Sequence, residues 1–114
     1  MAFVLKKSNT FKWPITVNAP VDGGTYQKVS FDLEFKDLTQ SRMDDIFQLS
    51  NDGNLSATEI AREIVVGWAG IEDDDGSELP FSIAGRDMLL DVPLMAATIV
   101  ETYLEIKNEA KRKN

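Results

Sequence analysis

Near the start of the chain, large apolar residues alternate with polar ones at the two-residue period of a half-buried β-strand. The first run has its apolar positions at Phe11, Trp13, Ile15 and Val17. The second run has them at Val29, Phe31, Leu33 and Phe35. A turn rich in proline and glycine within residues 19–25 separates the runs, so the pattern predicts an antiparallel hairpin with one apolar face.

Two details refine this hairpin. Pro14 cannot donate a backbone hydrogen bond, which predicts that its strand lies at a sheet edge or turns the proline to the unpaired side. Trp13 shares its face with Phe11 and Ile15, so we expect it to be a core residue. A further strand formed by residues 3–5 is an open alternative.

The following segments have the spacing of helices. Residues 38–49 predict one helix, for which Asp37 or Thr39 is the N-cap. Ser56 and Glu59 match the capping box, in which each side chain satisfies a backbone amide at the start of the helix. Ser82 caps a short helix that extends to Leu90.

A last helix is expected from about Val92 to about Asn108, with Pro93 in its first turn, where a missing amide costs nothing. Its apolar stripe contains Met95, Ile99, Tyr103 and Ile106, widened by Ala96, Val100 and Leu104. Residues 65–71 lose the helical pattern at two glycines, and residues 72–77 predict an exposed acidic loop where the chain reverses.

Together these elements predict an α+β fold, in which an N-terminal antiparallel β-hairpin or small sheet packs against a layer of three to four helices. The 114 residues suit a single domain, 1–114, because two cores would each be too small. The basic residues gather near the two ends, and we expect residues 1–10 and 107–114 to be flexible.

Charge narrows the classes of partner. Between Ser8 and Ile106 there are six basic side chains against 18 acidic ones, a net charge of −12. An acidic surface repels the phosphates of nucleic acids and anionic lipids, so we expect neither as a partner. The absence of cysteine fits a reducing compartment, and the order of charges before Ser8 is the reverse of a secretory signal.

Catalytic chemistry finds little support in the composition. The chain has no histidine and no cysteine, which removes the usual near-neutral base, thiolate nucleophiles and most zinc sites. Aligning Gly76 or Gly53 with the glycine of a calcium-binding EF-hand loop leaves Ile71 or Gln48 at the first ligand position. We therefore expect a protein that is not an enzyme and holds neither a cofactor nor a metal.

Trp68 is the residue of most functional interest, because it lies between Gly67 and Gly70. It fits either a core position that needs close backbone approach or an exposed anchor for a partner protein. We favour the core position, while the partner-binding alternative stays open.

The order of features resembles the tail assembly chaperones of long-tailed, non-contractile phages, over most of the chain from Trp13 to Tyr103. The segments that carry the resemblance are Trp13-Pro14-Ile15-Thr16-Val17, the turn with Pro20 and Gly23-Gly24, Phe31-Asp32-Leu33-Glu34-Phe35-Lys36-Asp37-Leu38, Gly67-Trp68-Ala69-Gly70-Ile71, Asp73-Asp74-Asp75-Gly76, Leu79-Pro80-Phe81-Ser82, Asp91-Val92-Pro93 and Ala97-Thr98-Ile99-Val100-Glu101-Thr102-Tyr103.

The resemblance implies a protein of the host cell cytoplasm that binds the tape measure protein and keeps it soluble. It would self-associate along that partner, recruit tail tube subunits and be absent from the mature virion. We expect the partner-binding surface to be bordered by Trp68, Phe81, Tyr103 and Leu104. Two other functions stay open, an acidic DNA mimic that inhibits a host DNA-binding protein and a minor structural tail protein. The concentration of acids in one loop argues against the mimic.

Overall fold

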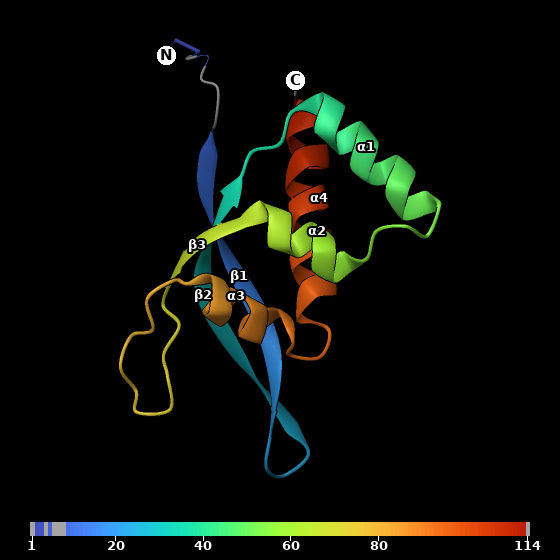
Figure 1. The fold of residues 1–114 in the computed structure, drawn as a ribbon. Helices are drawn as coiled ribbons and strands as arrows, with labels where there is room; N and C mark the ends of the chain where they lie inside the picture. Colours follow the sequence, from blue (N-terminus) through green and yellow to red (C-terminus); the bar gives the residue numbers. More distant parts are fainter. Residues whose placement is uncertain (1, 4, 6–8, 114) are drawn as a thin grey trace.

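A long antiparallel hairpin dominates the N-terminal part of the computed structural model, which describes residues 2–3, 5 and 9–113 (Figure 1). Strand β1, Thr10–Val21, pairs with β2, Thr25–Lys36, so that Phe11 faces Phe35 and Ile15 faces Phe31. The predicted hairpin is confirmed, but its strands are longer than expected. Only residues 22–24 form the turn, because the first strand continues through Pro20 to Val21.

A third strand, β3 at Val65–Ala69, completes a sheet of order β1-β2-β3. Sequence reasoning missed this strand because Gly67 interrupts its apolar pattern and Gly70 follows directly after it. Glycine suits position 67, because an added Cβ atom would lie 2.8 Å from Oε1 and 3.2 Å from Cβ of Glu34 on the neighbouring strand, and the Glu34 side chain would have to shift. The alternative strand at residues 3–5 is not formed by Phe3 or Leu5, and Val4 lies outside the described residues.

Strand β1 lies at the edge of the sheet, as Pro14 predicted. Pro20 lies in the same strand, and the two prolines limit the addition of another strand to this edge. The expectation that Trp13 is a core residue is wrong, because 43% of it is exposed. On the same face of this edge strand Ile15 is buried and Phe11 packs against the core, whereas Trp13 between them does not.

Three helices begin where the sequence indicates. Helix α1, Gln40–Asn51, has Thr39 as its N-cap, which decides between the two expected residues. Helix α2, Ala57–Ile64, starts with the predicted capping box of Ser56 and Glu59. Helix α3, Ile83–Leu90, is capped by Ser82, whose hydroxyl accepts a hydrogen bond from the amide of Gly85.

Helix α4, Met95–Lys113, begins three residues later than the expected Val92 and continues past Asn108. Pro93 therefore lies in the connection before the helix and not in its first turn. The cause is Leu94, whose φ of 66° is left-handed and incompatible with a helix. The helix starts only after this residue.

The core lies between the sheet and the helices, and the α+β class predicted from the sequence is confirmed. Helices α2 and α4 pack against each other beside the sheet, whereas the turn end of the hairpin extends beyond them (Figure 1). The Cα radius of gyration is 15.5 Å. A compact chain of this length would have about 13 Å, so the chain is extended, and residues 25–30 at the turn end of the hairpin are exposed. The largest fully buried side chains are Tyr103, Phe35, Ile15, Leu33, Ile64, Ile99 and Val65.

Candidate protein-binding surface

Trp68 and Phe81 form an aromatic pair at the β3 edge of the sheet. Their ring centroids are 5.0 Å apart, with the planes at 77°, an edge-to-face arrangement that aromatic rings favour. The indole nitrogen of Trp68 donates a hydrogen bond of 2.8 Å to the carbonyl oxygen of Leu79. Both rings are half-buried, and this bond fixes the segment that follows the acidic loop to the sheet.

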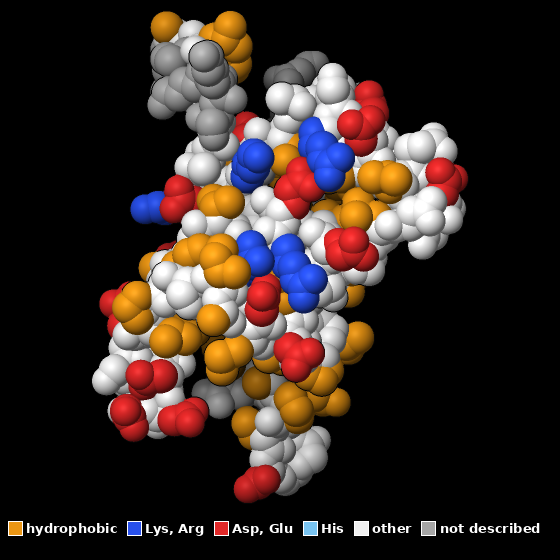
Figure 2. All heavy atoms as spheres, viewed as in Figure 1, with side chains coloured by type: hydrophobic (Ala, Val, Ile, Leu, Met, Phe, Trp, Pro, Cys, Tyr) orange, Lys and Arg blue, Asp and Glu red, His pale blue; other side chains and the backbone are white. Residues whose placement is uncertain are grey.

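Helix α3 packs on the Trp68 ring at Gly85, where an added Cβ would lie 3.2 Å from the indole Cη2. With that side against the sheet, Ile83, Ala84 and Met88 lie on the exposed side of the helix. The exposed fractions of Ile83 and Met88 are 59% and 71%. We call Phe81, Ile83, Ala84 and Met88 the α3 surface. Hydrophobic side chains gather over α3 and the connection that follows it (Figure 2).

A second apolar feature, the hairpin groove, lies between the turn half of the hairpin and the α3–α4 connection, with a volume of about 730 Å³. Its walls come from three distant parts of the sequence. The hairpin contributes residues 16–20, Val29 and Phe31, and the segment after β3 contributes residues 70–72. The remaining wall consists of Leu89, Val92, Pro93, Leu94, Met95 and Thr98.

Leu94 is a strained residue on the wall of the groove. It is the only described non-glycine residue with a positive φ, and 81% of it is exposed. A left-handed conformation costs a residue with a Cβ about 1–2 kcal/mol, and exposure recovers little of that cost. The backbone therefore holds a large apolar side chain at the mouth of the groove.

The acidic loop beside the groove is a small hairpin of its own. Leu79 donates its amide hydrogen to the carbonyl of Ile71, and Glu72 bridges to Glu78. One carboxylate oxygen of Asp73 accepts hydrogen bonds from the amides of Asp75 and Ser77. None of the ion pairs between described residues involves residues 72–78, so this loop concentrates uncompensated negative charge at one end of the groove.

The four residues expected to border a binding surface occupy two separate places. Trp68 and Phe81 lie together beside α3, whereas Tyr103 and Leu104 lie on α4. Tyr103 is 2% exposed and belongs to the core, where burial raises the pKa of its phenol. Leu104 is half-buried against the core and lines a small apolar gap together with Ile46 and Ile60. We therefore leave the α4 pair out of the candidate surface.

None of the groove residues was among the partner-binding residues expected from the sequence. Three of them, Val92, Pro93 and Leu94, are consecutive apolar residues just after Asp91, which could have indicated an apolar surface. The sequence analysis assigned Val92 and Pro93 to the start of the last helix instead. The hairpin wall carries no local signal, since only the tertiary fold brings it to the connection.

Among the residues that the structure describes, no group of three or more acidic side chains is placed to hold a metal ion. No helix in the same part of the chain combines the length and apolar character needed to cross a membrane. In comparisons with known proteins, no family model, curated protein or solved structure matches this chain.

Proposed function

We propose that the protein is a phage tail assembly chaperone, which binds the tape measure protein through the α3 surface. The observation that carries the proposal is the exposure of Ile83 and Met88 on a short helix held firmly against the sheet. Apolar patches of this kind on a small protein mark sites of protein association. The resemblance in the order of the sequence features supplies the identity of the partner.

The charge of the chain supports a solubilising role. An apolar segment bound to the α3 surface loses its exposure to water, and the acidic body adds charge to the complex. Repulsion between such acidic complexes opposes aggregation. In this proposal the protein acts in the host cell cytoplasm, self-associates, recruits tail tube subunits and is absent from the mature virion.

The test is an affinity purification from cells that produce the parent phage, stopped before tails are complete. Tagged wild-type protein is expected to recover the tape measure protein or the tail tube subunit, identified by mass spectrometry. The variant I83D/M88D should recover at least tenfold less of the partner, because charge is placed on the α3 surface. F47D is the matched control, since Phe47 is an exposed apolar residue on α1.

Equal recovery by I83D/M88D and wild type would remove the α3 surface from the binding site. Recovery of only a host DNA-binding enzyme would overturn the chaperone function and favour the acidic DNA mimic. Detection of the chain in purified virions would instead favour a structural tail protein. A circular dichroism melt of each variant establishes that the fold is retained.

A further inference from the structure

We propose that the hairpin groove receives residues 2–5 of a second copy of this chain, bound as an extended segment beside β2. The inference rests on the proposed function only in that copies associate with each other. It is tested on purified protein alone. Its failure would therefore leave binding of the tape measure protein intact.

An unpaired edge of β2 borders the groove. Strand β3 pairs with β2 only from Asp32 to Phe35, and no described strand pairs with residues 25–31 on that side. The chain leaves the sheet at Gly70, whose φ of 83° turns it toward the acidic loop. An extended segment can therefore continue the line of β3 along β2 and form main-chain hydrogen bonds there.

The sequence of residues 2–5 suits such a site. In an extended segment alternate side chains point to the same side, so Phe3 and Leu5 would both enter the apolar groove. Their exposed fractions are 86% and 89%, which means that their own chain leaves these side chains uncovered. Binding to a second copy would bury them against Val29, Phe31 and Ile71.

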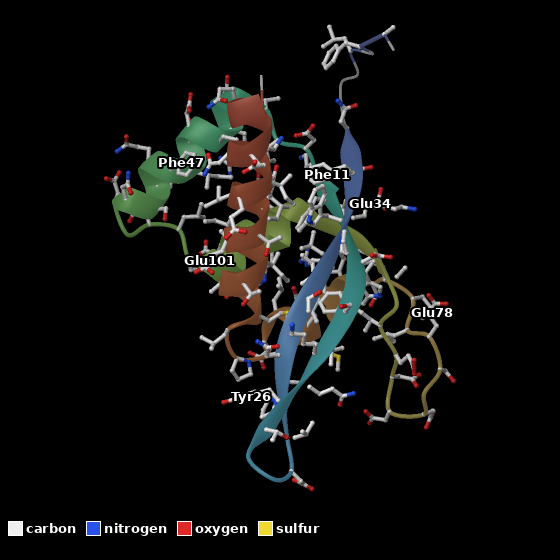
Figure 3. All side chains as sticks on the ribbon, turned by 180° about the vertical axis from the view of Figure 1, so that it is seen from behind. Phe11, Tyr26, Glu34, Phe47, Glu78 and Glu101 are labelled. Carbon is white, nitrogen blue, oxygen red and sulfur yellow. The ribbon has the colours of Figure 1, made fainter. Side chains whose placement is uncertain are left out.

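Geometry favours a second copy over the same chain. The N-terminus lies at the end of the hairpin opposite the turn, and Tyr26 marks the turn end (Figures 1 and 3). Leu5 can reach at most about 17 Å from Thr10, because five residues separate them. Val17 lies about 23 Å from Thr10 along the strand, so Leu5 cannot enter the Val17 end of its own groove.

Charge sets the direction of the bound segment. Lys6 and Lys7 follow the apolar residues in the sequence, and Glu72 lines the groove at the base of the acidic loop. Residues 72–75 and Glu78 supply five carboxylates without an ion pair among the described residues. The two lysines would approach this loop, so the association should weaken as ionic strength rises.

This contact joins two different surfaces, the donated segment of one copy and the groove of the next. A contact of this kind leaves a free segment and a free groove at the two ends of any assembly that does not close into a ring. Copies therefore add head to tail, either in an open chain or in a closed ring. An open chain differs from a closed dimer, in which two copies exchange their segments and growth stops at two.

Two variants block the two surfaces separately. F3D/L5D removes the donated apolar side chains, and V29D places a charge in the groove on the extended half of β2. Sedimentation velocity of wild type at increasing concentration should give a series of growing species. Each variant alone should associate at least tenfold more weakly, whereas F47D should behave as wild type.

Mixing the two blocked variants provides the decisive measurement. F3D/L5D retains an intact groove and V29D retains an intact segment, so the mixture should form one-to-one dimers and nothing larger. A synthetic peptide of residues 2–7 should shift the amide resonances of Val29, Phe31 and Ile71 in ¹⁵N-labelled F3D/L5D. A circular dichroism melt establishes the folding of each variant.

Several results would overturn the inference. They are a monomeric wild type at all concentrations, association of F3D/L5D equal to wild type, a mixture without the one-to-one dimer, or a peptide that shifts none of the groove amides. If V29D instead lost recovery of the tape measure protein while the peptide failed to bind, the groove would belong to that partner.

Discussion

The hydroxyl oxygen of Tyr103 lies 3.0 Å from the backbone nitrogen of Leu38 and accepts its hydrogen bond across 65 positions of sequence. The same hydroxyl donates to the carbonyl oxygen of Lys36 at 2.9 Å. Its ring packs on Phe35, with centroids 5.3 Å apart. One side chain of α4 thus satisfies two backbone groups where the chain leaves β2, and it fixes the helix to the sheet.

Replacing Tyr103 with phenylalanine should lower the free energy of unfolding by about 1–3 kcal/mol, because the buried amide of Leu38 loses its partner. Urea denaturation followed by circular dichroism measures the change. The matched control is Y26F, since Tyr26 is exposed near the hairpin turn (Figure 3). If Y103F were as stable as Y26F, the two hydrogen bonds would contribute nothing to the fold. Partner recovery by folded Y103F should equal that of wild type.

For Tyr103, the sequence predicted the helix and the core stripe but not the hydrogen bonds of its hydroxyl. Its helical stripe was predicted from the spacing of Met95, Ile99 and Ile106. The starts of α2 and α3 were predicted instead from their N-cap residues, Ser56 and Ser82. The hydrogen bonds to Lys36 and Leu38 leave no trace in the spacing, because the partners are backbone groups far away in the sequence. The residue was therefore expected at a surface as well as on a core stripe.

The strand β3 and the start of α4 were missed for a local reason. Gly67 weakens the strand pattern, and only the folded chain shows that its missing side chain leaves room for Glu34 on the neighbouring strand. Pro93 after Asp91 is typical of a helix start, and the left-handed Leu94 that delays the helix cannot be foreseen. Of the four residues expected to border a binding surface, Phe81 belongs to the α3 surface and Trp68 lies beside it, whereas Ile83 and Met88 were not among those expected. The groove depends on three segments that meet only in the folded chain.

Acid should weaken the contact between α1 and α2. Arg42 donates two hydrogen bonds to the carboxylate of Glu63, at 2.8 and 2.7 Å, and these bonds lower the pKa of Glu63 below its ordinary value of 4.5. Because the pKa of Glu63 is lower in the folded state than in the unfolded state, its charge stabilises the fold fully at any pH above the unfolded-state pKa. This stabilisation is lost as the pH falls through the folded-state pKa.

Urea titrations of E63Q and wild type should therefore differ most near neutral pH and converge as the pH falls below 4.5. E101Q provides the control, because Glu101 is an exposed glutamate on α4 (Figure 3). A constant difference at every pH would mean that the Glu63 side chain stabilises by packing and not by its charge.

Removing the capping box should destabilise α2. The hydroxyl oxygen of Ser56 accepts a hydrogen bond from the amide of Glu59 at 3.2 Å. Replacing Ser56 with alanine should lower the free energy of unfolding by about 1 kcal/mol, and replacement with glycine by only a few tenths. Thermal unfolding measures both changes. S41A, an exposed substitution inside α1, should be neutral or slightly stabilising. An S56A melt equal to that of wild type would show that the cap is not needed.

Leu94 offers a test of strain at the groove. Both L94A and L94G remove the exposed side chain, but only glycine adopts a φ of 66° without steric cost. L94G should therefore be more stable than L94A by up to about 1 kcal/mol. Glycine loses more chain entropy on folding than alanine does, but the steric strain that it relieves is larger. At Ile83 in the first turn of α3 the order should be inverted, with I83G less stable than I83A by about 0.5–1 kcal/mol.

If alanine were favoured at both positions, Leu94 would carry no strain. If L94G also weakened the association of purified protein while raising its stability, the strained conformation would serve to present this side chain to the groove.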